Sequence, residues 1–210
     1  MKISLIHPSR GRAQKSYDNA MMWVRLAGAP VELIVSLDSD DPALKEYQKK
    51  YSGYLVNGND GVVAATNKAA AQASGDILVY LSDDFASFPN WGQVIIKEFE
   101  KYTGPALIKV DDCLQNFHTQ VLTIPIMNRQ CYDKLGYFFH PAYKSMHCDE
   151  HLYHRTKKLG FLKFAPHIKF EHRHVSVGKA EDDETYRRSA ANWNHGKETL
   201  AKHRRLDFTV

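Results

Sequence analysis

The sequence predicts an α/β protein built on a mostly parallel sheet. Short apolar runs rich in β-branched residues alternate with longer segments whose apolar residues recur at helical spacing, which is typical of βαβ units. Clusters of Gly, Pro, Asn and Asp separate these segments. The chain has 210 residues, 43% of them hydrophobic, so it is long enough for one sizeable core. We therefore expect a single domain over residues 1–210.

The elements of the first half follow from this alternation. We expect strands at residues 3–6, 31–37, 54–56 and 76–81. A helix from about residue 13 has Tyr17, Met21 and Val24 spaced to face a core and ends at Gly28. Another helix begins after the turn cluster at residues 57–61 and is marked on one side by small apolar residues, which are Val62, Ala65, Ala69 and Ala73.

The second half has a sparser pattern. We expect a helix at residues 90–101, strands at 106–110 and 120–126, a short helix at 128–135, a helix at 149–159 and a strand at 168–171. The segment at 184–205 is polar and has helical spacing, so we expect it to lie across the surface.

Charge and cysteine content restrict the function classes. The net charge of +4 is mild, which agrees with an anionic partner such as a nucleotide diphosphate. No aromatic and basic platform is present, so nucleic acid is not expected as a partner. Cys113, Cys131 and Cys148 form no CxxC pair and leave an odd count, which favours a reducing, cytoplasmic location. No apolar run approaches the roughly 18 residues of a membrane span, and the apolar run at residues 3–6 is too short for a signal peptide.

The strand at residues 76–81 delivers Ser82, Asp83 and Asp84 at its carboxyl end, the edge where open α/β sheets bind ligands. Two adjacent carboxylates repel each other unless a cation or a proton intervenes. Mg²⁺ or Mn²⁺ accepts one or two carboxylates and completes its shell with water and substrate phosphates. The alternative is that both residues only cap the turn or helix that follows.

The surrounding segments resemble the GT-A glycosyltransferases, specifically the inverting family 2, over about residues 1–175. The likeness consists of a first strand ending in Pro-Ser-Arg, a second ending in Asp38, the helix at 61–68 and the run from Gly75 to Asp84. It implies the GT-A fold, a Rossmann-like three-layer αβα sandwich. It also implies a metal-dependent glycosyltransferase that uses Mn²⁺ or Mg²⁺ to move a sugar from a nucleotide-diphosphate sugar to an acceptor hydroxyl. Residues 1–105 would then form the nucleotide-sugar half, 106–180 the acceptor half and 181–210 a C-terminal helical segment.

The resemblance also assigns donor-binding roles to individual residues. It places the nucleotide against Pro8, Ser9 and Arg10, the base against Asp38, and Lys68 near the nucleotide. Asp84 matches the metal-binding final Asp of the DxD motif. Ser82 stands where many members have the first Asp, which leaves Asp83 as its substitute or as a ribose contact. The residues alone also fit a turn role for Asp38 and a solvated loop for Arg10 and Arg12.

A second group of ionisable residues lies at 147–155. In the resemblance, Asp149 matches the catalytic Asp of a Glu-Asp motif, with Cys148 in place of Glu, and acts as general base on the acceptor hydroxyl. Glu150 is the neighbouring candidate, about 100° away around the helix, and should matter less. Asp149 also fits a helix cap. A rival hypothesis from another class is a zinc metallopeptidase, because His147, Glu150 and His151 satisfy HxxEH.

Two histidines follow the last predicted strand. Alternate residues of an extended segment point the same way, so His172 and His174 share a side. The family often has a His after the base helix as a further metal ligand, which makes this pair the candidate; a surface pair is the alternative. Residues 178–187 are expected to form a loop that closes over the donor. A non-catalytic nucleotide-sugar-binding module of the same fold remains an alternative function, and the loop at 8–12 is a partial likeness to nucleotidyltransferases.

Overall fold

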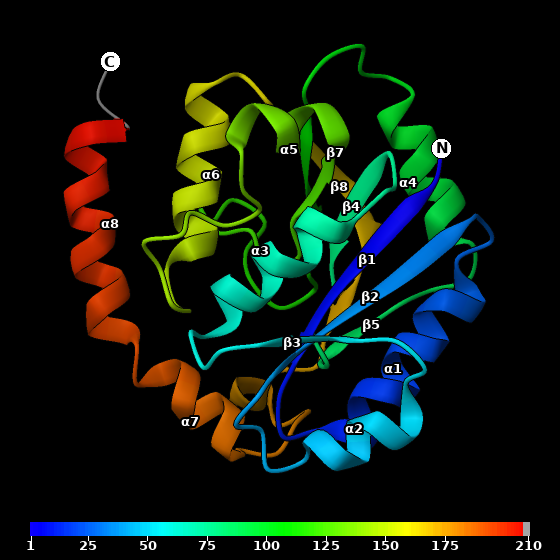
Figure 1. The fold of residues 1–210 in the computed structure, drawn as a ribbon. Coiled ribbons are helices and arrows are strands. Elements are labelled where there is room, and N and C mark those ends of the chain that lie inside the picture. The colour runs from blue at the N-terminus through cyan, green and yellow to red at the C-terminus, as the bar shows by residue number, and fades with distance from the viewer. Residues whose placement is uncertain (208–210) are drawn as a thin grey trace.

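The computed structural model describes residues 1–207 and contains a seven-stranded sheet with strand order β3-β2-β1-β4-β7-β6-β8 (Figure 1). Its strands in chain order are β1 (Ile3–Ser9), β2 (Val31–Asp38), β3 (Leu55–Asn57), β4 (Ile77–Tyr80), β6 (Leu107–Asp111), β7 (Ile126–Asn128) and β8 (Leu162–Lys169). Only β7 runs antiparallel to its neighbours, β4 and β6. The remaining strands are therefore parallel to one another, as the sequence predicts, and their carboxyl ends share one edge of the sheet.

Helices cover both faces of this sheet, and Figure 1 shows the resulting three layers. One face packs against α1 (Ala13–Leu26) and α4 (Trp91–Phe99), with α2 (Leu44–Lys50) beside α1. The other packs against α3 (Val62–Gln72), α5 (Arg129–Leu135) and α6 (Cys148–Lys158). Helix α7 (Glu184–Ala190) lies at the carboxyl edge of the sheet, and α8 (Trp193–Asp207) runs along the outside of this second layer, beside α6.

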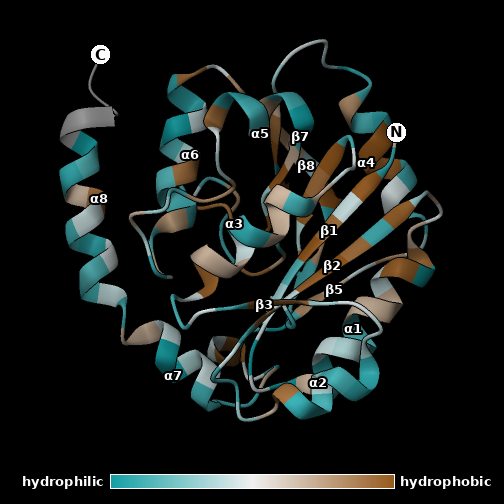
Figure 2. Ribbon diagram, viewed as in Figure 1, coloured by the Kyte–Doolittle hydropathy of each residue, from teal (hydrophilic) through white to brown (hydrophobic). Residues whose placement is uncertain are grey.

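The period of two along each strand divides its side chains between two cores. On β1, Ile3 and Leu5 are fully buried against α1 and α4, whereas Ile6 belongs to the core under α3 and α6. Both faces of the central strands are thus apolar, and Figure 2 shows them as the most hydrophobic part of the molecule. A buried sheet of this kind fixes the position of the carboxyl edge, where the polar residues gather.

Strand β1 is longer than the sequence predicts and includes the expected loop residues His7, Pro8 and Ser9. The pairing of β1 with β4 ends at Ile6, so Pro8 lies where β1 is paired on one side only. Proline is tolerated there because its missing N–H leaves no ladder bond unmade. The pairing of β1 with β2 therefore extends to Pro8 and Ser9, the first predicted residues of the site.

The buried face of α1 is offset from the predicted one. Tyr17, Met21 and Val24 are only partly buried, and Ser16 and Asn19 lie inside. The Ser16 hydroxyl forms a 2.8 Å hydrogen bond with His7 Nε2, and the Asn19 amide donates one of 3.1 Å to the Ser82 carbonyl oxygen. An apolar pattern alone does not detect polar residues that are buried because they have partners.

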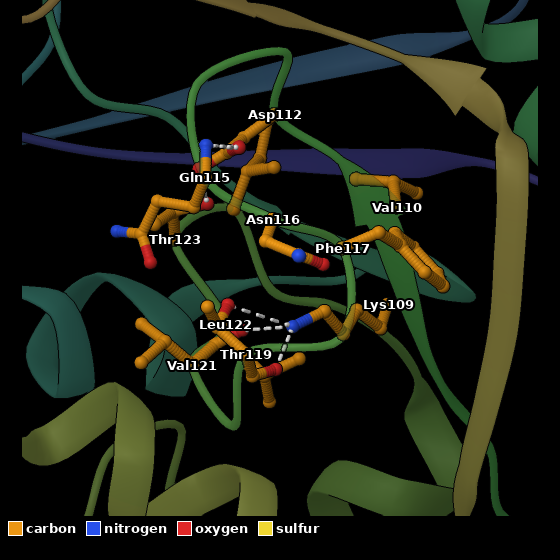
Figure 3. Close-up of a pocket in the computed structure, with 11 residues that line it drawn as sticks. Lys109, Val110, Asp112, Gln115, Asn116, Phe117, Thr119, Val121, Leu122 and Thr123 are labelled. Carbon is orange, nitrogen blue, oxygen red and sulfur yellow. Dashed lines mark hydrogen bonds between the residues drawn. The ribbon is translucent and has the colours of Figure 1, made fainter.

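The predicted strand at residues 120–126 is wrong, because only Ile126–Asn128 is a strand and residues 112–125 form an irregular loop. This loop wraps around Lys109 of β6, whose ammonium donates to the carbonyl oxygens of Thr119 and Val121, the latter at 2.8 Å (Figure 3). Lys109 is 5% exposed, and burial lowers its pKa. The loop thus supplies hydrogen-bond acceptors to the buried ammonium. The carbonyl groups that it uses would otherwise pair with a neighbouring strand.

The chain after α6 also differs from the prediction. The strand expected at 168–171 is split between β8, which begins at Leu162, and the two-residue β9 (Glu171–His172), which pairs with β5 (Phe85–Ala86). A 3₁₀ turn, η1 (Val175–Val177), follows. The helical segment expected at 184–205 is broken between α7 and α8. Among the described residues 1–207, no helix is long and apolar enough to cross a membrane.

Candidate functional site

A cavity of about 780 Å³ opens at the carboxyl edge of the sheet. Its floor is formed by the ends of β1, β2 and β4, its sides by the first residues of α3 and α6, and its remaining wall by α7 and the segment that leads into α8. Most of the predicted site residues line it: Pro8, Ser9, Arg10, Asp38, Asp83, Asp84, Asp149, His172 and His174. Residues far apart in the chain therefore meet where the sequence predicts a ligand.

Asp83 is buried and held by groups from the first strand. The Ser9 hydroxyl donates to its carboxylate at 3.0 and 3.2 Å, and His7 Nε2 lies 3.4 Å away. Burial raises the pKa of Asp83, while His7, Arg12 and Ser9 act in the opposite direction. Ser9 therefore has a structural role, since it fixes Asp83, and its contact with a nucleotide stays a prediction.

Asp84 is the carboxylate best placed for a cation. It is 5% exposed, its Oδ2 accepts a 2.8 Å hydrogen bond from the Tyr186 hydroxyl, and Oδ1 has no hydrogen-bond partner among the described residues. Burial on its own would raise the pKa of Asp84, but His172, Ser82 and Tyr186 lower it well below its usual range. A carboxylate whose neighbours favour its charged form, with one buried unsatisfied oxygen beside a cavity, fits a divalent cation.

His172 lies directly behind Asp84. Its Nε2 is 3.4 Å from Asp84 Oδ2, and its ring stacks on Phe85 with centroids 4.2 Å apart. Burial lowers the pKa of His172, but the neighbouring carboxylates of Asp112 and Asp84 raise it to about 9. The prediction that one histidine of the pair approaches the strand-end carboxylate therefore agrees with this geometry.

His174 lies further out in the same cavity. Its ring centroid is 5.1 Å from that of His172 and 5.1 Å from that of Tyr186, and its Nδ1 is 2.9 Å from the Ser176 hydroxyl. Within residues 1–207, no three His, Cys, Asp or Glu side chains form a group that would hold a metal ion by themselves. A cation on Asp84 and His172 would therefore need ligands from water and substrate phosphates, as Mg²⁺ and Mn²⁺ commonly do.

Arg10 and Asp38 line the cavity where β1 and β2 end. The Arg10 guanidinium donates to Asp38 at 3.2 Å and to Asp40 at 2.5 Å. Burial raises the pKa of Asp38, an effect that Arg10 opposes. Arg10 is thus tied to an acidic pair rather than solvated, and Asp38 faces the cavity instead of only forming a turn.

Lys68 is not brought to this cavity. It lies on the exposed side of α3, and its ammonium donates to the carbonyl oxygen of Val56 in β3. Gly61, Val62 and Ala65 are the α3 residues that line the cavity, one to two turns earlier. The geometry therefore does not support the predicted contact between Lys68 and the nucleotide.

Asp149 is in the first turn of α6 and lines the cavity from the side opposite β1. Its Oδ1 accepts a 2.9 Å hydrogen bond from the backbone N–H of Glu150. Burial raises the pKa of its carboxyl, which moves it toward the range useful for a general base. Cys148, beside it, is buried in the core, and burial raises the pKa of its thiol, so it does not replace a charged Glu.

Glu150 points away from the cavity toward α8. Its carboxylate accepts from Arg204 at 2.7 Å and lies 3.1 Å from His147 Nδ1. His151 is fully buried, with Nδ1 3.1 Å from the Tyr143 hydroxyl and its ring centroid 4.7 Å from that of His140. His147, Glu150 and His151 thus form contacts within the second helical layer, and this arrangement offers no support for a zinc peptidase.

Helix α7 is attached to the first loop of the protein. Arg12 donates to both carboxylate oxygens of Asp183 at 2.6 and 2.7 Å, and its guanidinium lies 4.4 Å from the centre of the Tyr186 ring. Asp183 also accepts from the backbone N–H of Tyr186 as the N-cap of α7. The segment predicted as a closing loop is therefore ordered over the cavity, with Tyr186 on Asp84.

Sequence reasoning missed two residues of this site, His7 and Asp112. His7 precedes the predicted Pro-Ser-Arg loop and is buried next to Asp83, so the end of β1 carries one more polar residue than expected. Asp112 lies just after β6, at the same sheet edge as Asp84. Its position after a parallel strand is the signal that could have identified it.

Comparison with known proteins agrees with this geometry. The model of glycosyl transferase family 2 matches residues 22–187. A search of curated protein sequences finds no match. Among solved structures, the chain is similar to the mannosyltransferase PcManGT from Pyrobaculum calidifontis in complex with GDP-Man and Mn²⁺, with a TM-score of 0.64 and 10% identity over 98% of this chain and 75% of that one.

Two further structures have the same fold. Residues 1–349 of S. aureus TarS, solved also in complex with UDP-GlcNAc, match with a TM-score of 0.61 and 15% identity, covering 98% of this chain and 72% of that one. Glucosyl-3-phosphoglycerate synthase from Mycobacterium tuberculosis, in complex with Mn²⁺, UDP and phosphoglyceric acid, matches with a TM-score of 0.61 and 15% identity, covering 84% and 73%. At sequence identities this low, the likeness shows only that the chain has the GT-A fold of these proteins.

Proposed function

The chain belongs to glycosyl transferase family 2, and from this premise we propose that it transfers a sugar from a nucleotide-diphosphate sugar to an acceptor hydroxyl, with a divalent cation and with inversion at the anomeric carbon. One observation carries the proposal. A single cavity contains both a charged carboxylate with an unsatisfied oxygen, Asp84, and a second carboxylate of raised pKa, Asp149. With such a pair, Asp84 would bind the cation and Asp149 would accept the proton.

The donor would lie along the carboxyl ends of β1, β2 and β4. Arg10, Asp38 and Ser9 would border the nucleotide, and Asp84 and His172, whose Nε2 and Oδ2 lie 3.4 Å apart, would hold Mn²⁺ or Mg²⁺. When bound, this cation stabilises the negative charge that develops on the leaving diphosphate. In this proposal residues 1–105 supply most of the donor site, residues 106–180 the acceptor site, and the stretch between Asp182 and Trp193 of the C-terminal segment the wall over both.

Asp149 would act on the acceptor. Its carboxylate takes the proton of the attacking hydroxyl while that oxygen displaces the diphosphate from the opposite face of the sugar, so one step inverts the anomeric carbon. The raised pKa of Asp149 makes its carboxylate a stronger base than that of an ordinary aspartate. The backbone N–H of Glu150 holds one carboxylate oxygen of Asp149, whose side chain is among those that line the cavity.

The structural neighbours support this proposal without fixing the substrates. PcManGT carries GDP-Man and Mn²⁺, and the glucosyl-3-phosphoglycerate synthase carries Mn²⁺ and UDP. These are complexes of proteins of the same fold, and fold alone does not determine the donor.

A thermal-shift panel tests the donor and the cation together. The purified chain is heated with UDP-, GDP-, CMP- and dTDP-sugars, each with and without Mn²⁺. We expect one donor to raise the Tm, by several degrees at saturating concentration, only when Mn²⁺ is present, because a ligand that binds the folded state alone stabilises it. Asp84→Asn should abolish this shift while leaving the ligand-free Tm within a few degrees. A full shift in Asp84→Asn would show that the carboxylate does not bind the cation.

A further inference from the structure

Asp112 contacts neither the nucleotide side of the cavity nor Asp149, yet its carboxylate is one of the most firmly held in the protein. It is 5% exposed, and Oδ1 accepts from the backbone N–H groups of Leu114 and Gln115 at 3.0 and 2.8 Å. The Thr123 hydroxyl donates to Oδ2 at 2.8 Å. Figure 3 shows Asp112 between Gln115 and Thr123 at the start of the loop that Lys109 stabilises.

The same residue is joined to His172 through both main chain and side chain. The backbone N–H of His172 donates to the Asp112 carbonyl oxygen at 3.0 Å. Asp112 Oδ2 lies 3.8 Å from His172 Nδ1, a buried nitrogen that has no hydrogen-bond partner within the described residues. A shift of under about 1 Å would bring these two atoms to hydrogen-bonding distance.

The other side of the imidazole is directed at Asp84. Nε2 is 3.4 Å from Asp84 Oδ2, and Phe85 stacks on the ring with an interplanar angle of 20°. Phe85 therefore restrains the ring against tilting, while Asp112 limits its position within the plane. The order Asp84, His172, Asp112 is that of a metal-binding histidine whose second nitrogen is held by a carboxylate.

We propose that Asp112 is a positioning residue: when a cation at Asp84 displaces the Nε2 proton of His172 to solvent, Asp112 keeps the remaining proton on Nδ1 and so directs the Nε2 lone pair toward that cation. This inference rests on the proposed function. A carboxylate behind a ligating histidine fixes both the tautomer and the orientation of the ring. The alternative is that Asp112 only caps the turn at residues 112–115, and then its charge would not affect cation binding.

The test uses Asp112→Asn, whose amide oxygen can still accept from Leu114 and Gln115 but which has no second acceptor for Nδ1–H. Asp111→Asn is the matched control, because Asp111 is the neighbouring residue and its carboxylate accepts from Cys113 rather than approaching His172. Binding of Mn²⁺ is measured by electron paramagnetic resonance at fixed pH, alone and with UDP or GDP. We expect Asp112→Asn to weaken binding about 10- to 100-fold and Asp111→Asn to leave it unchanged.

A double-mutant cycle separates positioning from general electrostatics. In a His172→Ala background, Asp112→Asn should cause no further loss of Mn²⁺ affinity if it acts through the imidazole. Equal Mn²⁺ affinity in the parent and in a folded Asp112→Asn variant would overturn the inference alone. Failure of the parent to bind Mn²⁺ with any nucleotide would reject the cation role itself, and with it this inference.

A measurement on the unmodified protein covers the case in which Asp112→Asn does not fold. Nitrogen-15 NMR of the histidine rings, recorded with Mg²⁺ and the nucleotide that binds, should show His172 with its proton on Nδ1. A proton on Nε2 of His172 in that complex would contradict the proposal, because Nε2 would then be unable to face a cation.

Discussion

Asp149 offers the clearest separation of catalysis from folding. Replacement by Asn keeps the size and the oxygen that accepts from the Glu150 N–H, but the amide cannot take a proton. We expect turnover to fall by about 10²- to 10⁴-fold while donor affinity changes little, because donor contacts lie on other elements. Single-turnover kinetics together with donor binding by calorimetry would check this.

Glu150→Gln is the matched control for Asp149→Asn. Glu150 does not line the cavity, and its carboxylate contacts Arg204 and His147, so this variant should retain most of its turnover. A nearly inactive Glu150→Gln beside a normal Asp149→Asn would reverse the assignment. Loss of donor binding in Asp149→Asn would instead favour a binding role for this carboxylate.

Glu32 gives a pH dependence that is independent of the cavity. Burial acts to raise its pKa, but hydrogen bonds from Lys2, Ser4 and Ser74 lower it to about 2. A depressed folded-state pKa stabilises the protein above the ordinary Glu value, and the contribution is lost as the pH falls toward about 2. With discount for solvent screening of a partly exposed side chain, we expect Glu32→Gln to cost about 1–2 kcal/mol at pH 7.

The check is denaturant unfolding of the parent and Glu32→Gln between pH 7 and pH 3. The difference in unfolding free energy should shrink as the pH falls below about 4.5. A difference that is constant over this range would mean that the lost hydrogen bonds, and not the charge, carry the effect.

How far the residues of the site could be predicted depended on their distance along the chain from a recognisable element. Asp83 and Asp84 follow the most apolar strand, and Asp149 begins a helix, so a local pattern identifies them. Asp112 becomes meaningful only beside His172, 60 residues later, and a single sequence does not show that pairing. The resemblance places Lys68 near the nucleotide, but this residue lies on the exposed side of α3 and does not line the cavity.

At the scale of elements, α7 would compete with the proposed cation for Asp84. The Tyr186 hydroxyl donates to Asp84 Oδ2, while its ring is held under Arg12. Tyr186→Phe removes this hydrogen bond and keeps the ring. We expect it to tighten Mn²⁺ binding by about 3- to 10-fold, since a hydrogen bond to a charged group is worth roughly 1.5–3 kcal/mol and part of it is recovered by water.

Calorimetric titration of Mn²⁺ into the parent and Tyr186→Phe would test this competition. Weaker binding in Tyr186→Phe would show instead that the hydroxyl supports the cation site. Arg187→Lys is a suitable control, because Arg187 is the adjacent residue of α7 and its guanidinium contacts the carbonyl oxygen of Asp182 rather than Asp84.

The loop at residues 112–125 shows why an element of the second half could not be predicted. Its residues have enough β-branched and apolar character to suggest a strand, yet the buried ammonium of Lys109 draws two of its carbonyl oxygens inward. A tertiary contact thus overrides local propensity. The small cavity of about 10 Å³ that the loop leaves is large enough for no more than one water molecule.

For the molecule as a whole, the predicted fold class is confirmed, because alternating elements and buried strands fix a parallel sheet almost by themselves. The exception is β7, whose antiparallel direction depends on how the 112–125 loop returns the chain between β4 and β6. Only three residues form this strand. A segment this short has too few residues for its sequence pattern to indicate either the direction of the strand or its place in the sheet.

The contact between Arg12 and Asp183 joins residues 171 positions apart and closes one wall of the cavity. Closing so long a loop costs conformational entropy before the contact contributes any favourable energy. Such a contact therefore forms only after most of the intervening chain has folded. The sheet and its two helical layers should therefore assemble before α7 docks, and the completed cavity should be a late product of folding. During synthesis, an unfinished chain would already contain both adjacent aspartates yet lack the wall that shields them from bulk water.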